Sequence, residues 1–215
     1  MGAAAPGLTL RVDALGRTQR AVLKSLAPFA RDHGFYLGGG TALALQLGHR
    51  RSVDFDWFRE EPLEDPLRLA AEIAVAGIRF KPSRTEAGTL HGVSRGVRLS
   101  FLEYRYPLLR PGLDEAGFVL ASLEDIAAMK MAAVAQRGSR KDFVDVFALG
   151  QRFRLEEMLG FYREKYGLED CGHVLVALSY FDDADRERMP TMLERWSWSS
   201  VKSAIGGWVR EAARG

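Results

Sequence analysis

The spacing of apolar residues predicts several helices in the first half of the chain. Residues 19–30 place Val22, Leu26 and Phe29 at the three- and four-residue spacing of one helix face. Good helix formers also fill two later stretches. The helices we expect in this half cover residues 19–30, 41–47 and 67–76.

Shorter apolar runs separated by glycines predict strands between and after these helices. On the strand that begins at residue 97, alternation places Arg98, Ser100 and Leu102 on the face opposite Glu103. The strands we expect cover residues 53–58, 78–82, 88–93, 97–104 and 117–121.

The second half of the chain has only helical patterns. Ser122 is followed three residues later by Asp125, which is the spacing of a capping box at a helix start. We expect Pro190 and the Gly206–Gly207 pair to limit the last helices. The predicted helices cover residues 123–136, 141–151 and 155–166, with two or three more between 172 and 213.

The change of pattern near residue 121 predicts an α+β fold. We expect a domain of mixed sheet and helices over residues 1–121 and an all-helical domain over residues 122–215. The length of 215 residues is enough for a substantial core. Apolar residues make up 47% and charged residues 27%, which excludes an intrinsically disordered chain.

Charge and cysteine content exclude further classes of protein. Lys plus Arg is 30 and Asp plus Glu is 28, so a net charge of +2 excludes a protein that holds nucleic acid by bulk charge alone. Cys171 is the one cysteine, which excludes an intramolecular disulfide and a Cys-rich zinc site. The most apolar stretch, residues 67–78, contains Arg68 and Glu72 and is too short to span a membrane. The first residues lack the pattern of a signal peptide, so we expect a cytoplasmic protein with no membrane partner.

Two acidic residues on one predicted strand are the first candidate for chemistry. Alternation along residues 53–58 directs Val53, Phe55 and Trp57 to the core, so Asp54 and Asp56 project together from the other face. Their backbones would lie about 7 Å apart, and two such carboxylates repel unless a cation lies between them. Mg²⁺ prefers hard oxygen ligands and keeps positions open for phosphate oxygens. The pair therefore predicts metal-assisted phosphoryl or nucleotidyl transfer.

A glycine run before the acidic strand favours the same chemistry. Glycines at 38–40 allow backbone N–H groups to approach a phosphate, and a helix that begins near Thr41 adds its positive dipole end. Arg50 and Arg51 lie between that helix and the acidic strand and could neutralise phosphate charge. Taken singly, a glycine run is commonly a turn, and exposed acidic or basic groups are commonly solvated. Their order along the chain is what favours a site.

The string from Gly38 to Phe58 resembles the AbiEii/AbiGii-type nucleotidyltransferase toxins of bacterial toxin–antitoxin systems. The signature of the wider nucleotidyltransferase superfamily is a Gly-Gly or Gly-Ser turn, a short helix, and Asp-x-Asp on the next strand. Lys130 resembles the helical lysine of the family, and residues 140–146 resemble its Arg/Lys-Asp-x-x-Asp-Leu segment. The resemblance spans about residues 35–149.

This resemblance implies a nucleotidyltransferase-fold domain followed by a helical domain, with a cleft between them. The implied activity is transfer of a nucleoside monophosphate from an NTP to an acceptor, with Mg²⁺ as cofactor. For the better understood members the acceptor is the 3′ end of tRNA, and a cognate antitoxin protein is the partner.

The resemblance also assigns roles to individual residues. Asp54 and Asp56 are expected to be catalytic and to hold Mg²⁺. Lys130 is expected to stabilise the triphosphate, and Asp145 to orient that lysine or to act as a general base. The residues expected to bind the nucleotide are Gly39, Gly40, Thr41, Arg51, Ser52 and Lys130.

Lys130 and Asp142, which both belong to segments that resemble the family, each have a purely structural alternative. Lys130 stands beside a buried stripe of Ala127, Met131 and Val134, so periodicity alone places it on the solvent face of its helix. Asp142 is favoured as an ordinary helix-start residue, where a carboxylate suits the positive dipole end.

A third carboxylate is not evident. The strand at residues 97–104 offers only Ser100 and Glu103, and alternation places Glu103 on the apolar side. This leaves a site of two carboxylates, a site that Asp145 completes from the helical half, or an altered activity. A protein that only binds nucleotide or a partner therefore stays open as an alternative. Transfer to a small molecule or protein also stays open, because the sequence does not reveal the acceptor.

Overall fold

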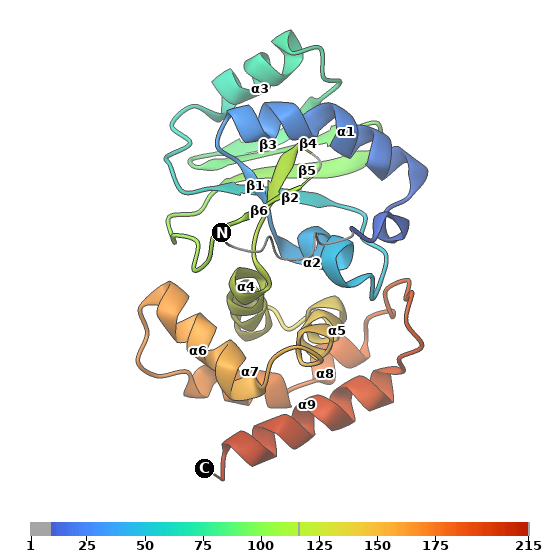
Figure 1. Ribbon diagram of the computed structural model, residues 1–215, viewed down its shortest axis with the longest axis vertical. Helices are drawn as coiled ribbons and strands as arrows, with labels where there is room; N and C mark the ends of the chain where they lie inside the picture. The colour runs from blue at the N-terminus through green and yellow to red at the C-terminus, as the bar shows by residue number, and fades with distance from the viewer. Residues whose placement is uncertain (1–9, 116, 215) are drawn as a thin grey trace, which may run out of the picture.

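The computed structural model describes residues 10–115 and 117–214, and the chain forms an α/β half stacked on a helical half (Figure 1). The α+β fold class expected from the sequence is confirmed. The elements of the α/β half are a short 3₁₀ helix η1 (Val12–Ala14), α1 (Arg17–Asp32), β1 (Tyr36–Leu37), α2 (Gly39–Leu47), β2 (Phe55–Arg59), α3 (Pro66–Val75), β3 (Lys81–Glu86), β4 (Thr89–Ser94), β5 (Val97–Glu103), β6 (Leu113–Glu115) and β7 (Phe118–Leu120).

These strands form one mixed sheet of seven strands in the order β3-β4-β5-β2-β1-β7-β6. β2 pairs in parallel with β5 and β1 pairs in parallel with β7, whereas the other neighbours are antiparallel. β2 is therefore the central strand. Helices α1 and α3 pack against the sheet on one side, and α2 packs against β2 and against the helical half.

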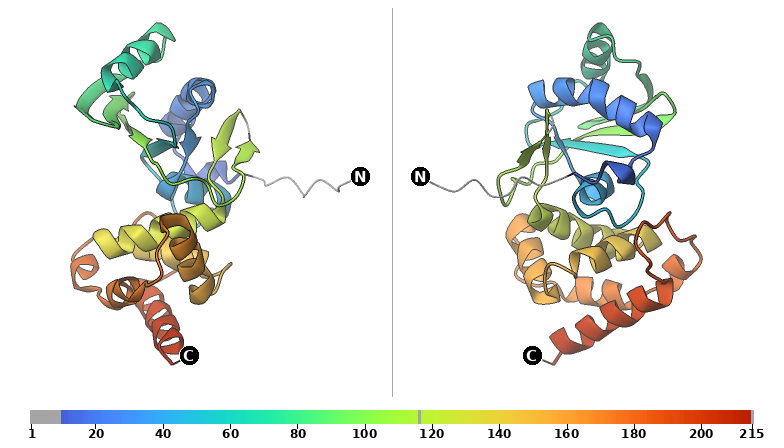
Figure 2. Two further views of the ribbon diagram at one scale, coloured as in Figure 1. Left: turned by 90° about the vertical axis from the view of Figure 1, so that its left-hand side faces the viewer. Right: turned by 45° about the vertical axis from the view of Figure 1, so that its right-hand side comes forward.

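The helical half comprises α4 (Leu123–Gln136), α5 (Arg140–Leu149), α6 (Leu155–Tyr166), α7 (Gly172–Ser179), α8 (Asp182–Asp185) and α9 (Trp198–Ala212). Both views in Figure 2 show these helices as a layer on one side of the sheet. Ser122 caps α4 as expected, because its side chain accepts a hydrogen bond from the Asp125 backbone N–H. Among the described residues, no helix has both the length and the apolar character needed to cross a membrane.

One cluster of buried apolar residues runs through both halves. Phe55, Trp57 and Phe101 are fully buried in the sheet, and Met131 and Phe143 are fully buried in the helices that pack beneath it. The domain boundary that we predict at residue 121 falls in the connection between β7 and α4. The division into two domains stays a prediction.

The central strand is shorter than the sequence predicts. β2 begins at Phe55, and Val53 is 56% exposed instead of facing the core. The Asp54 carbonyl accepts a hydrogen bond from the Thr41 hydroxyl, so the chain at residue 54 bonds to α2 and not to a neighbouring strand. Alternation along a strand therefore does not govern Val53 and Asp54.

Two further expectations about elements are wrong. Gly206 and Gly207 lie inside α9 and do not end it, since Val201 and Ile205 bury one face of that helix against the core. The strand expected at residues 78–82 instead covers Lys81–Glu86. The sequence does not predict β6, because its residues have no apolar pattern.

Candidate active site

A cavity of about 630 Å³ opens between the sheet and the helical half. Residues of α2, β2, β4 and β5 line it from the α/β half, and residues of α4, α5 and α6 line it from the other half. Its volume lies in the range of small-molecule sites. Most of the predicted site residues lie in its wall: Gly39, Gly40, Thr41, Ser52, Asp54, Asp56 and Lys130.

The start of α2 requires glycine at two successive positions. Gly39 has a φ of 61°, in the left-handed region, and a Cβ there would lie 3.2 Å from the Asp56 carboxylate. A Cβ on Gly40 would lie 2.4 Å from the Arg50 guanidinium. Bare backbone at the first turn of α2 is therefore what lets an acid and an arginine approach this helix end. The same turn leaves N–H groups beside the cavity, where an anion is stabilised.

Two hydroxyls fix the path of the chain between α2 and β2. The buried side chains of Thr41 and Ser52 are 2.7 Å apart, oxygen to oxygen, and Thr41 also bonds to the Asp54 carbonyl. Both residues line the cavity. Their hydrogen bonds stabilise the turn that places Asp54 in the cavity wall.

The two predicted metal ligands have different surroundings. Asp56 lies on β2 and lines the cavity. Asp54 also lines it, but its two oxygens accept hydrogen bonds of 2.8 and 2.7 Å from Arg98 of β5. Among the described residues no cluster of three or more His, Cys, Asp or Glu could hold a metal. The donor set of two carboxylates on one cavity wall fits Mg²⁺, which takes its other ligands from water and phosphate.

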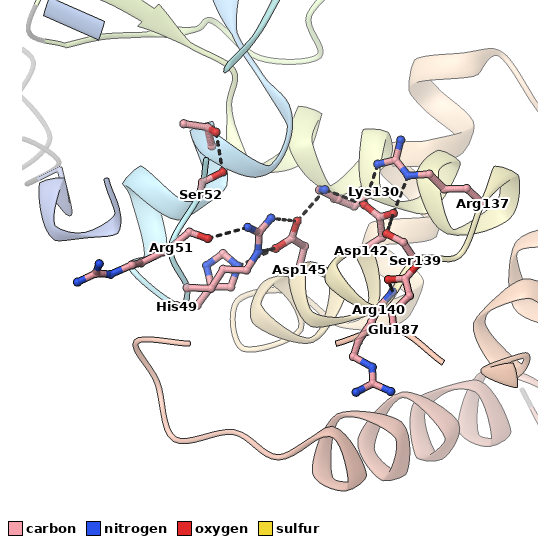
Figure 3. Close-up of polar contacts among 12 residues, drawn as sticks. His49, Arg51, Ser52, Lys130, Arg137, Ser139, Arg140, Asp142, Asp145 and Glu187 are labelled. Carbon is pink, nitrogen blue, oxygen red and sulfur yellow. Dashed lines mark hydrogen bonds and ion pairs between the residues drawn. The ribbon is translucent and has the colours of Figure 1, made fainter. Parts of the chain in front are cut away.

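A buried network of charges joins Lys130 and Arg50 of the cavity wall to Asp145 and Asp142 (Figure 3). Asp145 of α5 is fully buried, and its oxygens accept hydrogen bonds from His49 Nε2 at 2.7 Å and from Arg50 at 2.6 and 2.8 Å. The Lys130 ammonium is 2.7 Å from the Asp145 carboxylate and 3.0 Å from that of Asp142. The network thus joins the end of α2 to α4 and α5.

Asp142 is more than a helix-start residue. Its side chain is completely buried and accepts hydrogen bonds from Lys130, from Ser139 and, at 2.8 and 3.0 Å, from Arg137. The interpretation favoured from sequence, a carboxylate that merely suits the dipole end of α5, therefore covers only part of its role.

The electrostatics of the network favour the charged forms of Asp145, Lys130 and Asp142. Burial opposes ionisation of Asp145, but Arg50 and Lys130 outweigh it and hold the pKa of Asp145 well below its usual value of 3.8. Burial likewise opposes the charge of Lys130, but Asp145 and Asp142 raise the pKa of Lys130 above its usual 10.5. The pKa of Asp142 is also lowered, because Lys130 and Arg137 outweigh the effect of its burial.

Lys130 is not on the solvent face of its helix. Its side chain is 5% exposed and lines the cavity, so the structural alternative drawn from periodicity is wrong. An ammonium has three N–H groups. Among the described residues, the Lys130 ammonium pairs with two carboxylates, those of Asp142 and Asp145. One of its three N–H groups is therefore directed to neither carboxylate.

Asp145 and Arg51 have surroundings that limit their expected roles. The Asp145 side chain has no exposure, and its oxygens are paired with His49, Arg50 and Lys130, so it fits the orienting role and not that of a base. The Arg51 side chain is exposed, is not part of the cavity wall, and points away from Lys130 in Figure 3. Its backbone N–H instead donates to the Thr191 carbonyl at 2.8 Å. A nucleotide contact by Arg51 is therefore not supported.

Sequence reasoning missed a row of polar side chains next to Asp56. In the register of the sheet, Asp56 of β2 is opposite Ser100 of β5, and Ser100 is opposite His91 of β4. His91 Nδ1 is 3.1 Å from the Ser100 hydroxyl, and both residues line the cavity. Glu103 is not in the cavity wall; it accepts a hydrogen bond from the Leu63 backbone N–H at 3.0 Å. Alternation along residues 97–104 did indicate the face of Ser100, but only the strand register brings it beside Asp56.

Comparison with known proteins finds a relative by sequence and others by fold. No established family profile matches the sequence. An uncharacterized protein of Aquifex aeolicus (strain VF5) is 35% identical over 204 residues, which cover 92% of this chain and 97% of the relative. Among solved structures, a candidate nucleotidyltransferase from H. pylori aligns with a TM-score of 0.55 and 16% identity over 90% of both chains. The nucleotidyltransferase toxin MenT4 of Mycobacterium tuberculosis H37Rv aligns with a TM-score of 0.46 and 15% identity, over 91% of this chain and 90% of its own.

Proposed function

We propose that this chain, which belongs to one family with the Aquifex aeolicus protein and has the fold of the H. pylori nucleotidyltransferase-like structure, transfers a nucleoside monophosphate from an NTP to an acceptor. The observation that carries the proposal is the set of groups that line this one cavity. It combines the two acids Asp54 and Asp56, the glycine start of α2, and the ammonium of Lys130.

The roles of the residues follow from these positions. Asp54 and Asp56 would hold Mg²⁺, which when bound neutralises charge on phosphate oxygens. Backbone N–H groups at Gly39 and Gly40 would bind the terminal phosphates, as the positive end of a helix favours an anion. The N–H of Lys130 that neither carboxylate takes would donate to a phosphate oxygen. Asp145 and Asp142 position that ammonium rather than contact substrate.

The proposed reaction is a displacement at the α-phosphorus. A hydroxyl oxygen of the acceptor attacks that phosphorus, the bond to the bridging oxygen of the β-phosphate breaks, and pyrophosphate leaves. The hydroxyl proton passes to water at the cavity mouth. Cationic side chains and helix N–H groups placed around the phosphates before reaction stabilise the charge that develops on them.

We propose RNA as the acceptor, in particular the 3′ end of tRNA, and a role as the toxin of a toxin–antitoxin pair. The support is the resemblance of residues 38–58 and the charge at the cavity. Arg137 and Lys141 line it, and Arg98 beside it is 72% exposed. Exposed cations at a cavity mouth suit contacts to RNA phosphates. A cognate antitoxin would be the protein partner.

The test is incubation of the protein with Mg²⁺, total tRNA and each of the four NTPs carrying a label at the α-phosphate. We expect one or more NTPs to label the RNA. Asp56→Ala should abolish labelling, whereas the control Asp185→Asn, which alters an exposed ion pair with Lys202 outside the cavity, should not. Absence of labelling with every NTP, while calorimetry still detects NTP binding, would support the alternative of a nucleotide-binding protein without turnover.

The toxin role has a separate test. Expression of the chain should arrest bacterial growth, and Asp54→Ala or Lys130→Ala should relieve the arrest. Growth arrest that persists in both variants would contradict the toxin proposal but would leave the transferase activity to be judged by labelling.

A further inference from the structure

Four tyrosines form a cluster in the cavity wall, and Tyr104 packs against Phe58, which lies two residues beyond Asp56 along β2. Tyr104 comes directly after the last residue of β5, and Tyr106 lies two residues further on. Tyr162 and Tyr166 lie on α6. All four line the cavity. Ring centroids are 5.3 Å apart for Tyr104 and Tyr106, 4.7 Å for Tyr106 and Tyr166, and 4.9 Å for Tyr162 and Tyr166. Such distances are those of aromatic rings in direct contact.

The hydroxyl groups of three of these tyrosines already have partners. The hydroxyls of Tyr104 and Tyr166 bond to each other across the two halves of the molecule. The Tyr162 hydroxyl is 3.0 Å from His173 Nε2. These hydrogen bonds hold the three side chains in place in the cavity wall.

The phenols of Tyr104 and Tyr166 are held in their neutral form. Burial and the neighbouring phenols raise the pKa of Tyr104 above its usual 10.0. Burial raises the pKa of Tyr166 to about 12, against the opposing hydrogen bond from Tyr104. The Lys165 ammonium lies 5.5 Å from the centroid of the Tyr104 ring, but it is buried, pairs with Asp125 and is not in the cavity wall, so it is not available to a phosphate. Phe58, Leu102 and Met129 add apolar surface to the cavity lining.

One ring of the cluster is accessible to a ligand. Tyr106 is 43% exposed, and the structure gives its hydroxyl no partner among the described residues. An exposed ring beside fixed rings is a stacking surface for a flat, uncharged group.

We propose that this tyrosine cluster, Tyr104, Tyr106, Tyr162 and Tyr166, is the subsite for the base of the nucleotide, with Tyr106 as the stacking residue. The proposal rests on the proposed function, which places the phosphates at the glycine start of α2 and at Lys130. The polar groups and the tyrosines line one continuous cavity. A nucleotide likewise joins a charged triphosphate to a flat base.

The subsite would also couple the two halves of the molecule. Tyr104 and Tyr106 come from the α/β half, and Tyr162 and Tyr166 come from α6 of the helical half. A base stacked on Tyr106 would contact both, in addition to the existing bond between the hydroxyls of Tyr104 and Tyr166.

The experiment compares two ligands that share the polyphosphate and differ in the base. Calorimetry with Mg²⁺ measures the dissociation constants of the four NTPs and of inorganic tripolyphosphate. For the wild type we expect the tightest NTP to bind about 10-fold more tightly than tripolyphosphate, the effect of stacking on one aromatic ring. Tyr106→Ala should remove this difference and leave tripolyphosphate binding unchanged. Tyr106→Phe should retain it, because stacking needs the ring and not the hydroxyl.

Tyr180→Ala is the matched control, since Tyr180 is 53% exposed and lies outside the cavity. An unchanged preference for NTP in Tyr106→Ala would overturn the base subsite while the proposed function stands. Loss of affinity for RNA without loss of affinity for NTP would overturn it in favour of an acceptor subsite. No binding of either NTP or tripolyphosphate to the wild type would overturn both proposals.

Discussion

The Lys130 ammonium lies 2.7 Å from the carboxylate of Asp145, and neither side chain is more than 5% exposed. The contact joins α4 to α5, and Arg50 extends it to the end of α2. Lys130 lines the cavity, and the carboxylate of Asp145, which does not line the cavity, holds its ammonium in place. This arrangement separates the group that would contact substrate from the groups that position it.

Removal of the Asp145 charge should destabilise the protein strongly. In Asp145→Asn, Arg50 and Lys130 would remain buried with one carboxylate fewer, and breaking a buried pair in this way costs about 3–5 kcal/mol. Chemical denaturation would measure the loss. Asp185→Asn removes the partner of Lys202 at the surface and should cost no more than about 1 kcal/mol. Equal stability of the two variants would contradict the importance of the buried network.

We expect that Gly40 cannot be replaced by a larger residue without loss of stability, because Arg50 packs against it. A Cβ there lies 2.4 Å from Arg50 Nη2, so Gly40→Ala must displace the guanidinium from Asp145, and we expect a loss of about 1–3 kcal/mol. Gly160→Ala is the control, because its Cβ meets nothing within 4 Å inside α6. It should gain about 0.5–1 kcal/mol from helix propensity. Thermal unfolding of both variants checks the contrast, and a neutral Gly40→Ala would refute it.

Arg98 should compete with a divalent cation for Asp54. Removing the guanidinium in Arg98→Ala frees both Asp54 oxygens, while the loss of an exposed pair should change stability by no more than about 1 kcal/mol. We expect Mn²⁺, used as a spectroscopic substitute for Mg²⁺, to bind about fivefold more tightly. Electron paramagnetic resonance of free Mn²⁺ measures this directly.

Arg84→Ala is the control for that measurement, since Arg84 is exposed and pairs with Glu86 on the edge strand β3. Unchanged or weaker Mn²⁺ binding in Arg98→Ala would show that Asp54 is not a ligand or that Arg98 is needed to orient it.

Stability should fall at acid pH because of the two buried carboxylates. The pKa values of Asp142 and Asp145 are lower in the folded protein than the usual 3.8, so their contribution is complete above the unfolded pKa and is lost as pH falls through the folded one. The raised pKa of Lys130 acts in the opposite sense, with its contribution complete below 10.5 and lost as pH rises beyond it.

The free energy of unfolding should therefore decline below about pH 4 more steeply in the wild type than in Asp145→Asn. Urea titrations at a series of pH values check this. Parallel acid limbs for the two proteins would contradict the lowered pKa of Asp145.

Local sequence signals predicted the helices of the second half well. The hydroxyl of Ser122 and the apolar stripe of Ala127, Met131 and Val134 are determined by neighbours within one helix, and the structure confirms both. The same local signal failed for Lys130. Periodicity within α4 places it opposite the stripe, but the two carboxylates that neutralise it come from α5.

Contacts between distant strands were likewise beyond local patterns. The pairing of Arg98 with Asp54 and the position of Ser100 beside Asp56 depend on the parallel register of β2 with β5. Strand alternation gives the face of a residue and not its neighbour across the sheet. The tyrosine cluster has the same origin, because Tyr104 and Tyr166 are brought together only when the two halves pack.

Asp54 and Asp56 could be selected from the sequence because the Asp-x-Asp spacing after a glycine run is itself the signal. Their surroundings could not be. Asp56 is on the central strand, whereas Asp54 lies just before it and is held by Thr41 through its carbonyl. The metal role of the pair stays a prediction that the Mn²⁺ titration addresses.

The fate of the phosphates of an NTP tests the central claim most directly. The protein is incubated with Mg²⁺, total tRNA and NTP labelled either at the α- or at the γ-phosphate, and the RNA and the released products are analysed separately. Nucleotidyl transfer predicts that the α-label enters the RNA, that the γ-label leaves as pyrophosphate, and that Asp56→Ala abolishes both. Entry of the γ-label into RNA, or no release of pyrophosphate with any NTP, would contradict the account.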